Sequence, residues 1–157
     1  VNYRSKLKEL SILNGEMVAF ADLDVSMMMI DIDYFKQVND KFGHEEGDRI
    51  ISATARILKK KAKKSYVVRY GGDEFIVMGT VNNEKEIKDY WTAVEAEVEK
   101  YNQKNSKKAQ LSFSYGYEVF KVEASTYLEE CIRVTDEKMY RSKNQKKLAR
   151  AEKLKEN

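Results

Sequence analysis

Two glycines followed directly by two carboxylates constrain the fold of this chain more than any other feature. Gly71-Gly72-Asp73-Glu74 lies between two runs of β-forming residues, Tyr66–Val68 and Phe75–Met78. Because glycine tolerates the positive φ angles of a tight two-residue turn, this pattern predicts a β-hairpin. The hairpin would hold both acids at the exposed tip of a sheet. From these residues alone two interpretations stay open: the acids bind a divalent cation that carries phosphates, or they are merely solvated.

A second acidic segment lies upstream, at the end of an apolar run. Met27–Ile30 leads into Asp31-Ile32-Asp33, which predicts a buried strand with carboxylates at its C-terminal end. Alternate residues of a strand point to one side, so Asp31 and Asp33 are expected on the same side unless the chain turns between them. The segment that follows contains Lys36 and is punctuated by Gly43 and Gly47. An apolar strand, acids, a basic residue and a glycine-punctuated loop together indicate a site for nucleotide phosphates and metal.

The composition fits one intracellular domain. A chain of 157 residues with 42% hydrophobic content can bury a single sizeable core. Its one cysteine, Cys131, cannot form an intramolecular disulfide, which suits a reducing compartment, so we predict a cytoplasmic location. The apolar neighbours of Cys131 favour a buried, inert thiol over a reactive one. No apolar run reaches the ~20 residues that span a bilayer, so no membrane contact is expected.

The charge pattern does not favour a nucleic-acid partner. The formal net charge of +3 is modest, and the densest basic run is 59–64. Lysines in such a run suit the exposed C-terminal end of a helix, and no aromatic residues are interleaved for stacking on bases. We therefore predict no nucleic-acid binding.

The remaining pattern predicts an α+β sandwich around a largely antiparallel sheet. Helices are expected at 3–13, 48–60, 84–101 and 125–147, strands at 26–32, 66–69, 74–79 and 110–120, and a charged tail from residue 148. In the third helix the apolar stripe of Ile87, Trp91, Val94 and Val98 is interpreted as core and not as a cofactor site.

Several motifs together resemble the GGDEF domain of diguanylate cyclases. They occur in the family's order at Asp31–Asp40, Gly43-His44, Gly47-Asp48, Arg69–Phe75, Leu111–Gly116 and Thr135–Lys143. The resemblance covers nearly the whole chain and implies residues 1–148 as the domain, with 149–157 as a charged tail or linker. It also implies a five-stranded, mostly antiparallel sheet flanked by helices, similar to nucleotidyl cyclase and polymerase palm domains.

The resemblance implies two Mg²⁺ (or Mn²⁺) ions in each active site. Asp31 and Asp73 correspond to the shared carboxylate ligands, with the Ile32 backbone carbonyl completing one shell. Glu74 supports the site, and whether Glu74 or Asp73 contacts the reacting hydroxyl stays open. Such hard cations prefer oxygen ligands, which accounts for acids at these positions.

The family pattern also assigns substrate contacts. Asn39 and Asp48 correspond to the guanine-binding residues, although Asp48 also fits a helix N-terminal acid. His44 occupies a ligand-contact position, where a structural role is the alternative. Lys36 and Lys143 correspond to phosphate-binding lysines. Lys147 stands where the family commonly has arginine in Lys-x-x-Gly-Arg-Asn, so an ammonium group replaces a guanidinium that can donate two parallel hydrogen bonds. The glycine of that motif, which forms a turn, is also missing.

The resemblance implies condensation of two GTP into cyclic di-GMP plus two pyrophosphates across a homodimer. The alternatives are a catalytically weak GTP-binding regulatory domain attached to a cyclic di-GMP phosphodiesterase, or an interaction module that keeps only the fold. Residues 62–65 lack the family's inhibitory Arg-x-x-Asp motif. Because Val1–Arg4 resembles the end of the family's N-terminal motif, we expect a longer protein with a flanking sensory or phosphodiesterase domain.

Overall fold

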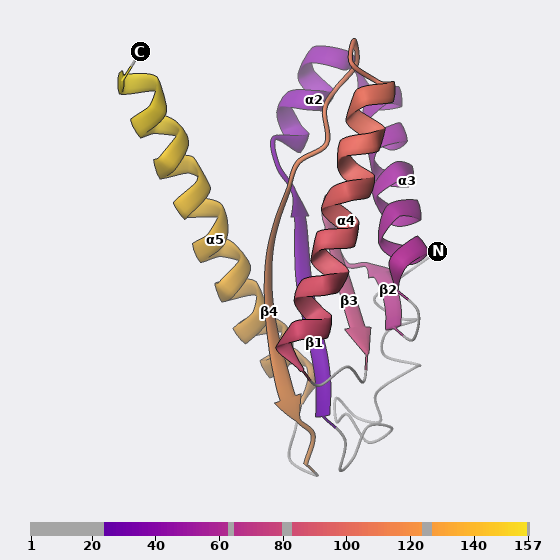
Figure 1. The fold of residues 1–157 in the computed structure, drawn as a ribbon, viewed down its shortest axis with the longest axis vertical. Helices are drawn as coiled ribbons and strands as arrows, with labels where there is room; N and C mark the ends of the chain where they lie inside the picture. The colour runs from indigo at the N-terminus through magenta and orange to yellow at the C-terminus, as the bar shows by residue number, and fades with distance from the viewer. Residues whose placement is uncertain (1–23, 63–64, 80–82, 124–126, 157) are drawn as a thin grey trace.

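The structure is a computed structural model that describes residues 24–62, 65–79, 83–123 and 127–156. Within these ranges helices and strands alternate irregularly along the chain (Figure 1). In order they are β1 (Asp24–Ile32), α2 (Phe35–Phe42), α3 (His44–Lys61), β2 (Ser65–Arg69), β3 (Glu74–Gly79), α4 (Glu84–Lys104), β4 (Phe113–Lys121) and α5 (Leu128–Glu156).

The described strands form one antiparallel sheet in the order β2-β3-β1-β4. The predicted α+β class and the predicted hairpin are therefore confirmed, with Val67 opposite Val77 in the β2–β3 pair. The sheet has four strands in the described ranges, where the family resemblance implied five.

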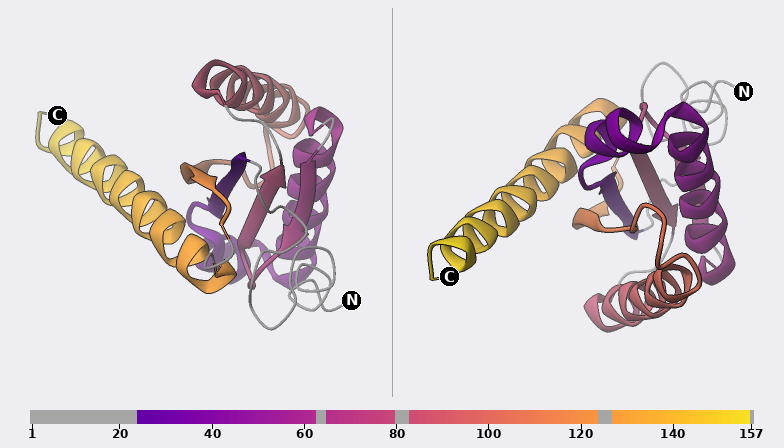
Figure 2. Two further views of the ribbon diagram at one scale, coloured as in Figure 1. Left: turned by 90° about the horizontal axis from the view of Figure 1, so that it is seen from below. Right: turned by 90° about the horizontal axis from the view of Figure 1, so that it is seen from above.

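Helices cover both faces of the sheet, so two apolar cores form (Figure 2). Met28, Ile30 and Ile32 of β1 pack with α3 and α4, and the core on that side includes Trp91. Met27 and Met29 face the other way and belong to the core that contains Cys131 and other residues of α5. This alternation is the two-residue period of a strand, and it leaves β1 buried on both faces. The predictions that Trp91 belongs to the core and that Cys131 is buried are confirmed.

Several bounds differ from the sequence-based expectation; for example, the strand expected at 110–120 is β4, which covers Phe113–Lys121. Residues 35–42 form α2, where we expected a loop, and α3 begins at His44 and not at Asp48. The expected charged tail from residue 148 is instead the last part of α5. The expected helix at 3–13 lies outside the described residues. None of the helices in the described ranges has an apolar stretch long enough to cross a bilayer.

Candidate active site

Two sheet segments bring the predicted metal-binding residues together. Asp31 lies one residue before the end of β1, opposite Glu74 of β3 in the strand register. The Ile32 amide donates a hydrogen bond to the Asp73 carbonyl at 3.0 Å, which fixes the tip of the hairpin to the end of β1. Asp31, Ile32, Asp73 and Glu74, which are far apart in sequence, are therefore neighbours at one end of the sheet.

The hairpin turn differs from the predicted two-residue turn. The connection between β2 and β3 spans residues 70–73, and neither Gly71 nor Gly72 adopts a positive φ. The expected reason for these glycines was therefore wrong. A Cβ at Gly72 would meet no atom within 4 Å, so this glycine leaves open space beside Asp73. The Arg69 guanidinium holds the turn by donating to the carbonyl oxygens of Gly71 at 3.1 Å and Gly72 at 2.6 Å, a role that the sequence analysis missed.

Asp31 is a buried carboxylate next to a second acid. Its side chain forms an ion pair with Lys143 through Oδ2, whereas its buried Oδ1 has no hydrogen-bond partner in the described part of the chain. Burial raises the pKa of the Asp31 carboxyl to about 6 against the opposing effect of Lys143, and the nearby Asp73 adds to the rise. Concentrated negative charge with an unpaired oxygen is an environment that a cation would stabilise.

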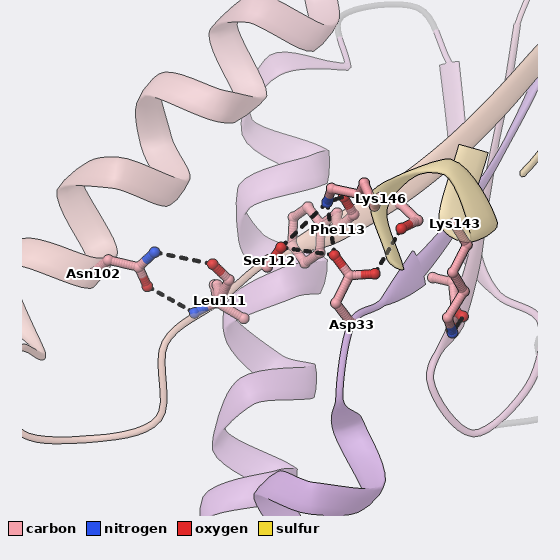
Figure 3. A network of polar contacts seen from close by, with 9 residues as sticks. Asp33, Asn102, Leu111, Ser112, Phe113, Lys143 and Lys146 are labelled. Carbon is pink, nitrogen blue, oxygen red and sulfur yellow. Dashed lines mark hydrogen bonds and ion pairs between the residues drawn. The ribbon is translucent and has the colours of Figure 1, made fainter. Parts of the chain in front are cut away.

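Asp33 lies on the same side as Asp31, as predicted, and anchors α5 to the sheet. It accepts hydrogen bonds from Ser112 at 2.7 Å, Ser114 at 2.6 Å and Lys146 at 2.7 Å (Figure 3). Lys146 also donates to the Phe113 carbonyl at 2.6 Å. Burial acts to raise the pKa of Asp33, but the hydrogen bonds from Lys146 and the two serines outweigh burial and hold the pKa below its ordinary value. The sequence analysis did not identify Lys146.

A cavity of about 300 Å³ opens beside these residues, between the start of α2 and the last part of α5. Its lining includes five of the predicted site residues, which are Ile32, Lys36, Asp73, Lys143 and Lys147. Larger cavities of about 700 and 720 Å³ lie beside Trp91 and Tyr90. Neither of them is lined by the acids at the end of β1. The smaller cavity therefore combines the carboxylates with the basic side chains.

Three predicted ligand contacts lie at the junction of α2 and α3: Asn39 and Asp48 for guanine, and His44 at a ligand-contact position. Asn39 is half-buried on α2, one helical turn after Lys36, and His44 and Asp48 are exposed on the first turns of α3. A Cβ at Gly47 would lie 1.9 Å from Asn39 Oδ1, so this glycine is required for the close approach of Asn39 to the start of α3. Asp48 lies past the first turn of α3, so the alternative of a helix-terminal acid does not hold.

The residues at the end of β1 fit a divalent cation. Asp31 Oδ1 is buried and unpartnered among the described residues, and Asp73 supplies a second carboxylate beside it. The described ranges contain no cluster of three or more histidine, cysteine or acidic side chains arranged to hold a metal ion. Mg²⁺ is usually held by one or two carboxylates together with water and substrate phosphates, so two acids and the Ile32 carbonyl are a sufficient protein contribution.

The fold and the site define a class of α+β domain in which one sheet end presents carboxylates to a pocket of basic side chains. The family model described as "Diguanylate cyclase, GGDEF domain" matches residues 4–148, and the chain belongs to this family. It is 35% identical over 122 residues to diguanylate cyclase DosC of Escherichia coli K12, covering 76% of this chain and 26% of that protein. It is 33% identical over 138 residues to diguanylate cyclase VdcA of Vibrio cholerae, covering 83% of this chain and 40% of that one. The chain thus spans less than half the length of these relatives.

Solved structures share the fold. The GGDEF domain of DgcB from Caulobacter crescentus, solved in complex with c-di-GMP, superposes with a TM-score of 0.75 at 22% identity, covering 92% of this chain and 86% of that one. The active GGEEF domain of a diguanylate cyclase from Vibrio cholerae gives a TM-score of 0.65 at 20% identity, covering 91% and 84%. These similarities confirm an antiparallel sheet flanked by helices.

Proposed function

We propose that this domain condenses two GTP molecules into cyclic di-GMP and two pyrophosphates. The observation that carries the proposal is a pocket lined by Asp73 together with Lys36, Lys143 and Lys147, with the Asp31 carboxylate next to it and paired with Lys143. Carboxylates attract the cations that accompany a nucleoside triphosphate, and lysines attract its phosphate oxygens. A site that offers both groups side by side suits a metal-bound triphosphate better than either ligand alone.

In this mechanism the acids hold the metal and the lysines hold the phosphates. Asp31, the Ile32 carbonyl and Asp73 would bind Mg²⁺ or Mn²⁺, two per active site, and Glu74 would support them. When bound, the ions acidify the attacking 3′-hydroxyl and stabilise charge on the phosphates. Lys36 and Lys147 would neutralise negative charge that develops on the triphosphate. Lys143, whose ammonium contacts Asp31, would bind phosphate oxygens beside the carboxylates.

Asn39 and Asp48 would select guanine. The Asp48 carboxylate accepts hydrogen bonds from guanine N1–H and its amino group, a donor pair that adenine lacks, and Asn39 bonds the base edge. Lys36 and Asn39 lie on one helix three residues apart, so α2 connects the base to the phosphates. His44 is exposed at the start of α3, the helix that follows α2, and would contact the ligand there.

The proposed reaction needs a homodimer, because each domain binds one GTP and each 3′-hydroxyl attacks the α-phosphate of the other. A longer parent protein with a sensory or phosphodiesterase domain would bring two such domains together. The proposal includes no nucleic-acid partner.

The test is to incubate the purified protein with GTP and Mg²⁺ and to separate the nucleotides by chromatography. We expect cyclic di-GMP from the unmodified protein and from Asp89→Ala, which removes an exposed acid on α4. Asp73→Ala is expected to abolish turnover, because it removes a metal ligand, while its circular dichroism spectrum stays unchanged. Cyclase activity in Asp73→Ala would contradict the assigned metal role. GTP binding without product, even with Mn²⁺ and forced dimerisation, would instead favour the regulatory-domain alternative.

A further inference from the structure

The basic side chains of the active-site pocket differ in their partners. Lys143 and Lys146 are paired with Asp31 and Asp33, so they neutralise the acids at the end of β1. Lys147 and Arg150 also line the pocket, and in the described part of the chain neither forms a salt bridge with a carboxylate. The pocket therefore carries surplus positive charge on the last part of α5, and a polyanion is the ligand that this charge favours.

Arg150 reaches the pocket because α5 does not turn after Lys143. The helix contains no glycine or proline. Lys146 holds the helical turn after Lys143 against the sheet by donating to Asp33 and to the Phe113 carbonyl. Residues three and four apart lie on one face of a helix, so Lys143, Lys147 and Arg150 form one continuous row. The continuation of the helix thus adds a guanidinium to a pocket that otherwise has only ammonium groups.

Tyr34 provides a surface on which this guanidinium rests. It directly follows Asp33 and has a left-handed backbone with φ of 60°, which is uncommon for a bulky residue. The Arg150 Cζ lies 4.8 Å from the centre of the Tyr34 ring. A guanidinium on an aromatic face keeps its N–H groups available at the edge, where they match the spacing of phosphate oxygens.

We propose that Arg150 binds the triphosphate of the substrate. Its guanidinium can donate two parallel hydrogen bonds to phosphate oxygens, which the ammonium of Lys147 cannot do, and it lies one helical turn after Lys147 on α5. This inference rests on the proposed function, because the triphosphate is that of the GTP substrate.

The experiment measures binding by calorimetry for the unmodified protein, Arg150→Gln and Lys153→Gln. Lys153 is the matched control because it is exposed on the same helix and carries the same charge but does not line the pocket. The ligands are a non-hydrolysable GTP analogue with Mg²⁺, guanosine, and inorganic tripolyphosphate. We expect Arg150→Gln to weaken binding of the analogue and of tripolyphosphate about tenfold, because it removes a charge-assisted hydrogen bond. Guanosine binding should not change, and Arg150→Lys should recover part of the loss.

Two results would overturn the role of Arg150. One is equal affinity of Arg150→Gln and Lys153→Gln for the analogue and tripolyphosphate. The other is an equal loss for guanosine, which would indicate a structural effect. Failure of the proposed function looks different: the unmodified protein would bind tripolyphosphate but not the GTP analogue, and Arg150→Gln would still weaken tripolyphosphate binding.

Discussion

Asp48 is the residue on which nucleotide selection is expected to depend. It is exposed on α3, so replacing it should change a ligand contact without changing the fold. We expect Asp48→Ala to reduce the ratio of GTP to ATP affinity about 30-fold, since a hydrogen-bonded charge is lost. Calorimetric titration with both nucleotides measures this ratio. Asp40→Ala removes an exposed acid from the neighbouring helix and serves as the control. An unchanged ratio in Asp48→Ala would remove Asp48 from the base site.

Cys131 illustrates how burial controls reactivity at a single residue. Burial raises the pKa of its thiol from 9.0 to about 11, and the neighbouring Glu130 carboxylate adds to the rise. At pH 8 the thiolate fraction falls from about a tenth to about a thousandth, so alkylation should be at least about a hundredfold slower than in the unfolded chain. Mass spectrometry after iodoacetamide treatment, with and without urea, measures the two rates. The native rate should increase as the pH rises towards 11, and equal rates at pH 8 would show that the thiol is accessible.

Gly116 determines how closely α5 can approach β4. A Cβ built on this residue would lie 2.2 Å from the Met139 amide nitrogen, so Gly116→Ala must displace the helix backbone. We expect the free energy of unfolding to fall by about 2 kcal/mol and GTP affinity to weaken, because Lys143 and Lys147 move with the helix. Urea denaturation measures the first effect. Gly72→Ala is the matched control, where a Cβ meets no atom within 4 Å and the change should stay within about 0.5 kcal/mol. Equal stability of the two variants would contradict the packing argument.

The elements that the sequence predicted correctly are those with a strong apolar period. β1, the hairpin strands and α4 each bury a regular set of side chains, so pattern and structure agree. Helix α2 was missed because it is short and buries only Val38, which leaves little periodic signal. The end of α5 was missed because its charged residues resemble a solvated tail. The segment nevertheless contains no glycine or proline and consists of good helix formers, so α5 continues through it.

The residues at the end of the sheet were predicted more completely than the pocket residues of the last part of α5. Asp31, Asp73 and Lys36 lie within motifs that resemble those of the family, so their proximity could be expected from that resemblance. Lys146 and Arg150 lie after the last motif, and their roles follow from the position of α5 across β4, which no local pattern encodes. Arg69 was part of a quoted motif, but its contacts to the turn carbonyls become visible only in three dimensions.

At the scale of the whole molecule, the site is assembled from α2, β1, the hairpin, β4 and α5. The C-terminal end of β1 lies beside the start of α2 (Figure 1), and Lys143 and Lys146 of α5 form ion pairs with the acids there. One chain offers a single set of the Asp31 and Asp73 carboxylates, and a cyclic product made from two nucleotides requires two reactions. A two-fold symmetric pair of chains supplies both sites with the same contacts, so the whole-molecule consequence of the proposed chemistry is a dimer.

This requirement predicts that specific activity rises with protein concentration. If only the dimer reacts, the active fraction follows mass action, so product per chain should increase steeply on concentration and level off when all chains are paired. Chromatographic assay of cyclic di-GMP across a dilution series, with sedimentation velocity on the same samples, compares activity with the dimer fraction. Fusion of a parallel coiled coil before residue 1 should remove the concentration dependence, whereas the same fusion carrying Asp73→Ala should stay inactive. Constant specific activity in samples that sediment as monomers would show that one chain completes the reaction alone, and the face-to-face arrangement would be wrong.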